Sequence, residues 1–86
     1  MKMSVSQALD LAGAHFQAGR LAETETVCRT VLDIAPGEDR ALTMLGLVAY
    51  HRGDRARATR FFQQAAAINS QAQQALLCLA VIYQSE

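Results

Sequence analysis

The sequence predicts an all-α fold in which five antiparallel helices form helix-turn-helix repeats. Three observations lead to this prediction. Alanine, leucine, glutamine, arginine and glutamate recur through the 86 residues, with one proline and five glycines, a composition that favours helices. Apolar residues return every three or four positions, as they do on one face of a helix. The chain also resembles itself when it is shifted so that Leu11 falls on Leu45.

The internal repeat is visible as columns of residues that share size or polarity. In order, the columns are Leu11 with Leu45 and Leu79, Ala12 with Gly46 and Ala80, Ala8 with Leu42 and Leu76, Ala22 with Ala56, Gly19 with Gly53, and Ile34 with Ile68. Because the spacing is constant, we expect one pair of helices to occur twice and a fifth helix to repeat the first half of the pair.

The helix boundaries follow from the apolar spacing and from the turn residues. The predicted helices span residues 6–18, 21–34, 40–52, 55–68 and 71–84. Gly19 and Gly53 stand where a helix must end, because glycine accepts the left-handed conformation of a C-cap. Asp54 can cap the next helix, and Pro36 with Gly37 separates the first pair from the second. Ser70 and Gln73 have the spacing of a capping box before the fifth helix.

In spacing and residue type the chain resembles the tetratricopeptide repeat, a helix-turn-helix unit of about 34 residues. The second unit has the closer likeness, through Leu45, Gly46, Ala49, Gly53, Asp54, Ala58 and Phe62. The first unit keeps Leu11, Ala12, Gly19, Ala22 and Pro36. Departures from the family pattern are Ala49 in place of tyrosine, Ser70 in place of proline, and His15, Thr24 and Cys28 at signature positions of the first unit.

The resemblance implies how the chain is divided and arranged. It places one unit at residues 5–38, a second at 39–72 and a half unit at 73–86, together forming a single domain. The units are expected to stack as a short right-handed solenoid whose concave side binds a peptide or another protein.

Composition and charge argue against a membrane protein and a secreted one. Residues 75–83 form the longest apolar run, nine residues against the roughly 20 that a bilayer requires. The start of the chain reaches Asp10 before any long apolar run, so a secretory signal is not supported. Cys28 and Cys78 have neither the density of a disulfide scaffold nor the spacing of a zinc site. We therefore expect a soluble, cytoplasmic protein with reduced thiols.

The titratable residues do not form an enzyme site. His15 and His51 fall on different helix faces with no acidic residue at a metal-ligand spacing. We expect His15 to pack between helices and His51 to be more exposed. No nucleophile, base and orienting acid share a cleft, so we predict no catalysis, no cofactor and no metal. The remaining candidates are assigned to packing, namely Val27, Cys28, Phe61 and Phe62 and the small residues Ala12, Gly46, Ala56 and Ala58.

The net charge is zero but unevenly distributed, with five acids and two arginines in residues 5–38 and two acids and five arginines in residues 39–72. An arginine cluster, Arg52, Arg55, Arg57 and Arg60, could meet phosphates or an acidic partner. The alternative is intramolecular, since Glu23 and Glu25 lie on the equivalent helix of the first unit. Nucleic-acid binding is disfavoured because no aromatic residues interleave with the arginines.

The concave groove is the predicted binding site. The resemblance assigns its lining to Leu9, Gly13, Phe16, Gln17, Thr43, Leu47, Tyr50, His51, Leu77, Val81 and Gln84. This lining is mostly apolar, whereas family members that clamp a carboxylate use lysine, arginine and asparagine. We therefore expect an apolar helix or extended segment to dock on Phe16, Leu47 and Tyr50. The alternative is that neighbouring helices cover some of these positions.

The fifth helix is apolar on all sides, and such a helix is normally buried. We expect Leu76, Leu79, Ala80 and Tyr83 to cover the second unit, and Leu77, Val81 and Ile82 to mediate self-association into a homo-oligomer. Two alternatives to a binding module thus remain open. The chain could be a self-associating structural unit, or an N-terminal regulatory piece of a longer array or enzyme, such as a glycosyltransferase or sulfotransferase.

Overall fold

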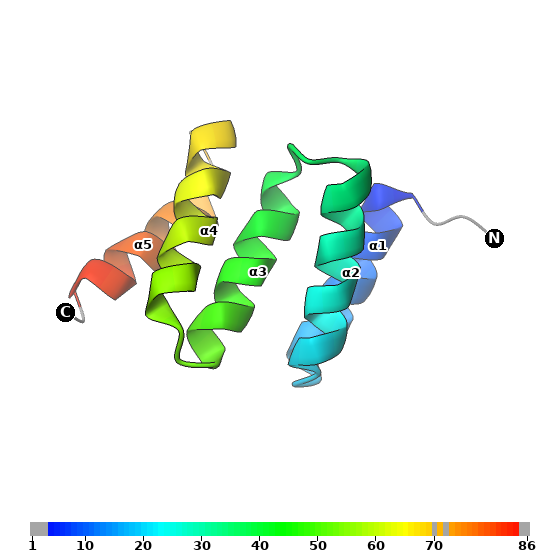
Figure 1. The fold of residues 1–86 in the computed structure, drawn as a ribbon, viewed down its shortest axis with the longest axis horizontal. Coiled ribbons are helices and arrows are strands. Elements are labelled where there is room, and N and C mark those ends of the chain that lie inside the picture. Colours follow the sequence, from blue (N-terminus) through cyan, green and yellow to red (C-terminus); the bar gives the residue numbers. More distant parts are fainter. Residues whose placement is uncertain (1–3, 70, 72, 85–86) are drawn as a thin grey trace.

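The chain forms five α-helices in a computed structural model, which describes residues 4–69, 71 and 73–84. In order they are α1 (Val5–Gln17), α2 (Leu21–Ile34), α3 (Asp39–His51), α4 (Arg55–Ile68) and α5 (Gln73–Gln84). The predicted all-α fold is confirmed, and each predicted boundary lies within two residues of the observed one. Each helix packs against the next, and α1 also contacts α3. Figure 1 shows α2, α3 and α4 in a row, with α1 behind α2 and α5 behind α4.

The helices recur at the spacing that the sequence predicted. The shift that places Leu11 on Leu45 also carries α1 onto α3 and α2 onto α4, and both ends of each helix then coincide. The buried residues follow the same shift, with Thr24, Cys28 and Val31 in α2 and Ala58, Phe62 and Ala65 in α4. For α2 and α4 the repeat therefore describes packing as well as sequence. The first helices of the pairs correspond less closely, because Leu11 is 38% exposed whereas Leu45 is buried.

Two turns of the same geometry reverse the chain within each pair. Gly19 and Gly53 have φ angles of 80° and 82°, the left-handed values that their positions predicted. In the second turn, Gly53 N donates to Tyr50 O at 3.0 Å and Asp54 N donates to Ala49 O at 2.9 Å, which is the Schellman pattern. Equivalent bonds close the first turn.

Helix starts are capped unevenly. Asp54 accepts a hydrogen bond from Arg57 N at 3.1 Å and so caps α4 as predicted. Ser4 and Gln7 form a reciprocal capping box at the start of α1, which was not predicted from the sequence. The predicted box of Ser70 with Gln73 includes Ser70, which lies outside the described residues.

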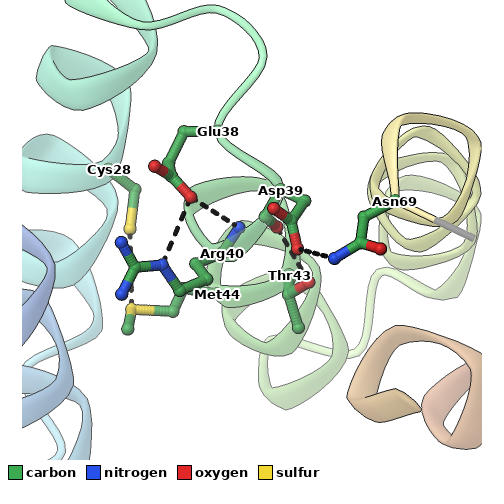
Figure 2. A network of polar contacts seen from close by, with 7 residues as sticks. All are labelled: Cys28, Glu38, Asp39, Arg40, Thr43, Met44 and Asn69. Carbon is green, nitrogen blue, oxygen red and sulfur yellow. Dashed lines mark hydrogen bonds and ion pairs between the residues drawn. The ribbon is translucent and has the colours of Figure 1, made fainter. Parts of the chain in front are cut away.

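Several polar contacts lie near the start of α3, and one of them reaches α4. Figure 2 shows Asn69, at the end of α4, pointing toward Asp39, with Asn69 Nδ2 donating to Asp39 Oδ2 at 3.4 Å. Thr43 Oγ1 donates to the Asp39 carbonyl oxygen at 2.9 Å. Glu38 accepts a bond from the backbone N of Arg40 and pairs with its guanidinium at 3.2 Å. The bond between Asn69 and Asp39 joins the end of α4 to the start of α3, and the other contacts are local to the start of α3.

Two hydrophobic clusters form the core. The first contains Leu9, Ala12, Cys28, Val31, Ala41 and Leu45, and the second contains Leu42, Ala49, Ala58, Phe62, Ala65, Ala75, Leu79 and Ile82. Leu32 and Phe61 pack against both clusters and so join the two helix pairs. Phe62 and Cys28 are buried, and Phe61 and Val27 are half-buried, which agrees with their assignment to the core.

Two packing predictions were wrong. Ala56 is exposed at the start of α4, so it does not bring neighbouring helices together, although Ala12, Gly46 and Ala58 are buried as expected. Helix α5 is rotated from its predicted orientation. Ala75, Leu79 and Ile82 are buried, whereas Leu76, Ala80 and Tyr83 are exposed. The buried residues follow an i, i+4, i+7 spacing, which is the stripe that one helix presents to its neighbour.

Candidate functional site: an apolar hollow between α3 and α5

An apolar hollow of about 220 Å³ lies between α3 and α5. Its lining comes from Leu47, Tyr50 and His51 of α3, from Leu77, Cys78 and Val81 of α5, and from Phe62 of α4 below. The α3 positions are separated by three and four residues, so they share one face of the helix. The α5 positions meet the same condition. Helix periodicity thus turns apolar side chains of two helices toward one space.

The exposed wall of the hollow is the α5 side. Leu77 is 67% exposed and Val81 is 52% exposed, whereas Leu47 and Tyr50 are half-buried. The polar groups of the lining are the Tyr50 hydroxyl, the His51 imidazole and the Cys78 thiol. Burial raises the pKa of the Cys78 thiol above its ordinary value, which keeps this group uncharged at neutral pH.

A second, more open hollow of about 460 Å³ adjoins the first. It is lined by Phe16, Gln17, Gly19, Leu21 and His51. His51 borders both spaces, and its ring meets that of Phe16 edge to face with the centroids 5.3 Å apart. The Tyr50 ring lies 6.2 Å from the His51 ring at 90°. His51 is exposed, as expected, and its aromatic contacts connect the two hollows.

The structure therefore brings together seven of the residues predicted for the groove. These are Phe16, Gln17, Leu47, Tyr50, His51, Leu77 and Val81. They come from three helices, and those carrying Phe16 and Leu77 lie far apart in the sequence. The resemblance to the tetratricopeptide repeat led to this grouping, because it implies that the first helices of successive units line one groove.

Other predicted site residues lie elsewhere. Leu9 and Thr43 are buried, with Leu9 in the first core cluster, so neither lines an open surface. Gly13 is half-buried, and a Cβ built on it would meet Met44 Cε at 3.8 Å. Gln84 is exposed but borders neither hollow. Leu9, Gly13 and Thr43 are repeat equivalents of lining residues, yet Leu9 and Thr43 are buried and Gly13 lies beside Met44 of α3.

The predicted self-association surface requires one correction. Leu77 and Val81 are exposed, but Ile82 is fully buried against α4 in the second core cluster. The rotation of α5 explains the difference, because a helix apolar on every side gives no sequence signal for which side faces its neighbour. Leu76 and Tyr83, which were expected to face inward, are instead 45% and 54% exposed.

Four lining residues were missed. Gly19 and Leu21 belong to the turn and to the start of α2, whereas the predicted lining came only from the first helix of each pair and from the fifth helix. Phe62 was assigned to the core, and it also forms the floor of the hollow. Cys78 could have been predicted from the sequence. It lies three positions before Val81, and Leu77 lies four positions before it, so all three residues share one face of the helix.

The described residues do not assemble a metal centre. No group of three or more histidine, cysteine, aspartate or glutamate residues lies close enough to hold an ion within that part of the chain. Cys28 is buried, its Sγ lies 3.9 Å from Met44 Sδ, and burial raises the pKa of its thiol to about 11. A thiol in this setting is a packing residue, because the reactive form is the thiolate.

Among the described helices, none has the length and apolar character needed to cross a bilayer. No protein-family model matches the chain. A search of curated proteins found no match.

Proposed function

We propose that the chain is a protein-binding module of the tetratricopeptide type, which holds an apolar helix or extended segment in the hollow between α3 and α5. The observation that supports this most is the convergence of Leu47, Leu77 and Val81 on one space. The recurrence of helices and buried positions at one constant shift supports the family, and with it a short right-handed solenoid.

Binding would be driven by removing apolar surface from water. Leu77 and Val81 are more than half exposed, and covering such side chains contributes about 25 cal/mol for each Å² of apolar surface buried. Tyr50 and His51 supply polar atoms at the edge, where they can bind the backbone or polar side chains of the ligand. The ligand is therefore expected to present one or two apolar side chains flanked by hydrogen-bonding groups.

The lining favours an uncharged ligand segment over a carboxylate. Among the described residues, no lysine, arginine or asparagine borders either hollow, so a carboxylate entering them would lose water without gaining a cationic partner. We propose binding without catalysis, because the lining offers apolar contact in place of grouped reactive side chains. Two free thiols fit a reducing compartment, and we accordingly propose a cytoplasmic location.

A peptide selection tests the proposal. Peptides selected from a displayed library for binding to the wild-type chain should bind it reversibly in solution. Leu47→Glu places a charge in the hollow, so it should weaken their binding by at least about tenfold. Leu77→Glu, at a more exposed position that costs less folding stability, should do the same.

Leu11→Glu is the matched control, because Leu11 is an exposed leucine on the side of α1 away from Phe16. Circular dichroism establishes that all three variants remain helical. Helical Leu47→Glu and Leu77→Glu variants that keep wild-type affinity would rule out the hollow as the binding site.

Self-association is a second candidate, favoured by the exposed side of α5. Leu76, Leu77, Val81 and Tyr83 are four large apolar side chains on one helix, each at least 45% exposed. Helix α5 carries no charged residue, so two copies could pair across a two-fold axis without like-charge repulsion. Because Leu77 and Val81 also line the hollow, a second copy and a peptide ligand would compete.

A further inference from the structure

A separate cleft of about 210 Å³ lies on the other side of α3, where α2, α3 and α4 meet. Its floor consists of Leu45, Val48 and Ala49 of α3, which are buried, and Phe61 of α4, which is half-buried. These α3 residues lie on the helix face opposite to Leu47, so the cleft and the hollow are independent surfaces. The function proposed for the hollow does not use this cleft.

Charged side chains from three helices surround the apolar floor. Glu25 and Arg29 come from α2, Arg52 follows α3, and Asp54 and Arg57 lie at the start of α4. Arg52 Nη1 donates to Glu25 Oε1, which links the two helix pairs. Arg29 Nη2 lies 2.9 Å from the second oxygen of Glu25. The predicted ion pairing between the pairs is thus present, through Glu25.

These pairs leave positive charge at the rim. Three guanidinium groups face two carboxylates, a net charge of +1, and the Arg57–Asp54 pair is loose, with Nε and Oδ2 3.7 Å apart. Arg57 is 66% exposed. Arg60 is also exposed, one turn further along α4, and forms no ion pair with any described residue. One more carboxylate would balance the rim, and guanidinium forks bind carboxylates well.

The floor determines what else the ligand must carry. A cavity of about 150 Å³ lined by aliphatic and aromatic side chains accommodates benzene, so this cleft has room for one aromatic or branched aliphatic side chain. Phosphate alone would leave the half-buried Phe61 ring uncovered. The chemistry of the cleft therefore matches an apolar side chain that is flanked by carboxylates.

We propose that this cleft binds an acidic protein segment, with one apolar side chain of the segment on Phe61 and its flanking carboxylates on Arg52 and Arg57. A nucleic acid fits less well, because the arginines are not interleaved with exposed aromatic rings on which bases could stack. Binding at this cleft is independent of binding at the hollow.

Fluorescence anisotropy with a labelled Glu-Glu-Phe-Glu-Glu peptide tests the proposal, with Glu-Glu-Ala-Glu-Glu and Lys-Lys-Phe-Lys-Lys peptides as comparisons. The first peptide should bind, more tightly than either comparison, and more weakly as salt rises to about 0.15 M, where charges are screened beyond about 8 Å. Arg57→Glu should weaken binding by about tenfold or more, the effect of losing a hydrogen bond to a charged group.

Arg55→Glu is the control, because it makes the same change in net charge two residues away, at an exposed arginine that does not border the cleft. It should change the affinity by less than about twofold, within the small effects of exposed charges. Leu77→Gln, which alters the hollow, should leave acidic-peptide binding unchanged, so that failure of this proposal and failure of the hollow are distinguishable.

Four results would overturn the proposal. The Glu-Glu-Phe-Glu-Glu peptide fails to bind folded wild-type chain, or the Glu-Glu-Ala-Glu-Glu peptide binds equally well, which would mean that the floor is not used. The third is an equal loss of affinity in Arg57→Glu and Arg55→Glu, which would mean general charge attraction. Inorganic phosphate that displaces the peptide completely at equal concentration would likewise contradict a site built for an acidic segment.

Discussion

Gly46 and Phe62 determine how closely α3 and α4 approach each other. A Cβ built on Gly46 would lie 2.5 Å from Phe62 Cε1, closer than real contacts allow. The equivalent residues of the first helix pair are Ala12 and Cys28, both fully buried. Compared with the first pair, the second pair has a smaller residue on its first helix, Gly46, and a larger one on its second helix, Phe62. The two changes offset each other, which keeps the packing dense in both pairs.

We predict that Gly46→Ala lowers the free energy of unfolding by about 1 to 3 kcal/mol, because the added methyl group overpacks the core against Phe62. Phe62→Leu in the same chain should recover part of this loss. The measurement is thermal or denaturant unfolding of the two single variants and the double variant, read as a double-mutant cycle.

Gly13→Ala is the matched control for Gly46→Ala. Gly13 is also a helical glycine, but a Cβ built on it would make only an ordinary contact with Met44 Cε at 3.8 Å. Alanine is the better helix former by about 0.5 to 1 kcal/mol, so Gly13→Ala should leave stability unchanged or raise it. Equal destabilisation by both substitutions would contradict the packing described for Gly46.

At the scale of the helices, the sequence predicted most of what local chemistry determines. The boundaries of α2 and α4, the left-handed glycines and the Asp54 cap follow from residues within a few positions of each feature. The rotation of α5 did not follow, because an evenly apolar helix leaves its orientation to its neighbour.

Tertiary context also explains Thr24, a polar residue that is fully buried at the position equivalent to Ala58. Its hydroxyl donates to Arg20 O at 2.9 Å and lies 3.4 Å from Ala12 O, so it is satisfied by the backbone of α1 and its own turn. For the hollow, likewise, the sequence predicted which helices supply the lining. It did not predict that Leu9 and Thr43 are buried, because their burial depends on residues of other helices, which the apolar spacing along one helix does not reveal.

The turns give a prediction at this scale. Gly53→Ala should lower the free energy of unfolding by about 1 kcal/mol, since an L-residue is strained at a φ of 82°. Gly37→Ala is the control, because Gly37 is outside the positive-φ region and a Cβ there meets nothing within 4 Å. Chemical denaturation of both variants measures the difference. A Gly53→Ala variant as stable as Gly37→Ala would mean that the turn does not need the left-handed conformation.

Considered as a whole, the molecule is an elongated row of helices, 44 × 27 × 17 Å along its principal axes, and our proposals concern three of its surfaces. The hollow lies between α3 and α5, the charged cleft lies on the opposite side of α3, and the exposed side of α5 is uncharged. Because α3 borders the first two, our two binding proposals concern opposite faces of one helix.

Self-association belongs to this scale. If α5 pairs with a second copy, sedimentation at micromolar concentration should show a dimer that Val81→Glu dissociates, because the new charge would be buried at the interface. Ile34→Glu is the control, as Ile34 is 71% exposed on α2 and away from α5. A wild-type chain that sediments as a monomer throughout the micromolar range would refute pairing through α5.

The central claim is that the hollow between α3 and α5 receives an apolar segment. The most direct measurement is a titration of isotope-labelled chain with a selected peptide, followed by the chemical shifts of its backbone amides and methyl groups. We predict that the largest shifts occur at Leu47, Tyr50, His51, Leu77 and Val81, with small changes at Leu45, Val48 and Arg52 on the opposite face. Saturable binding whose shifts concentrate on that opposite face, and leave Leu77 and Val81 unaffected, would contradict the claim.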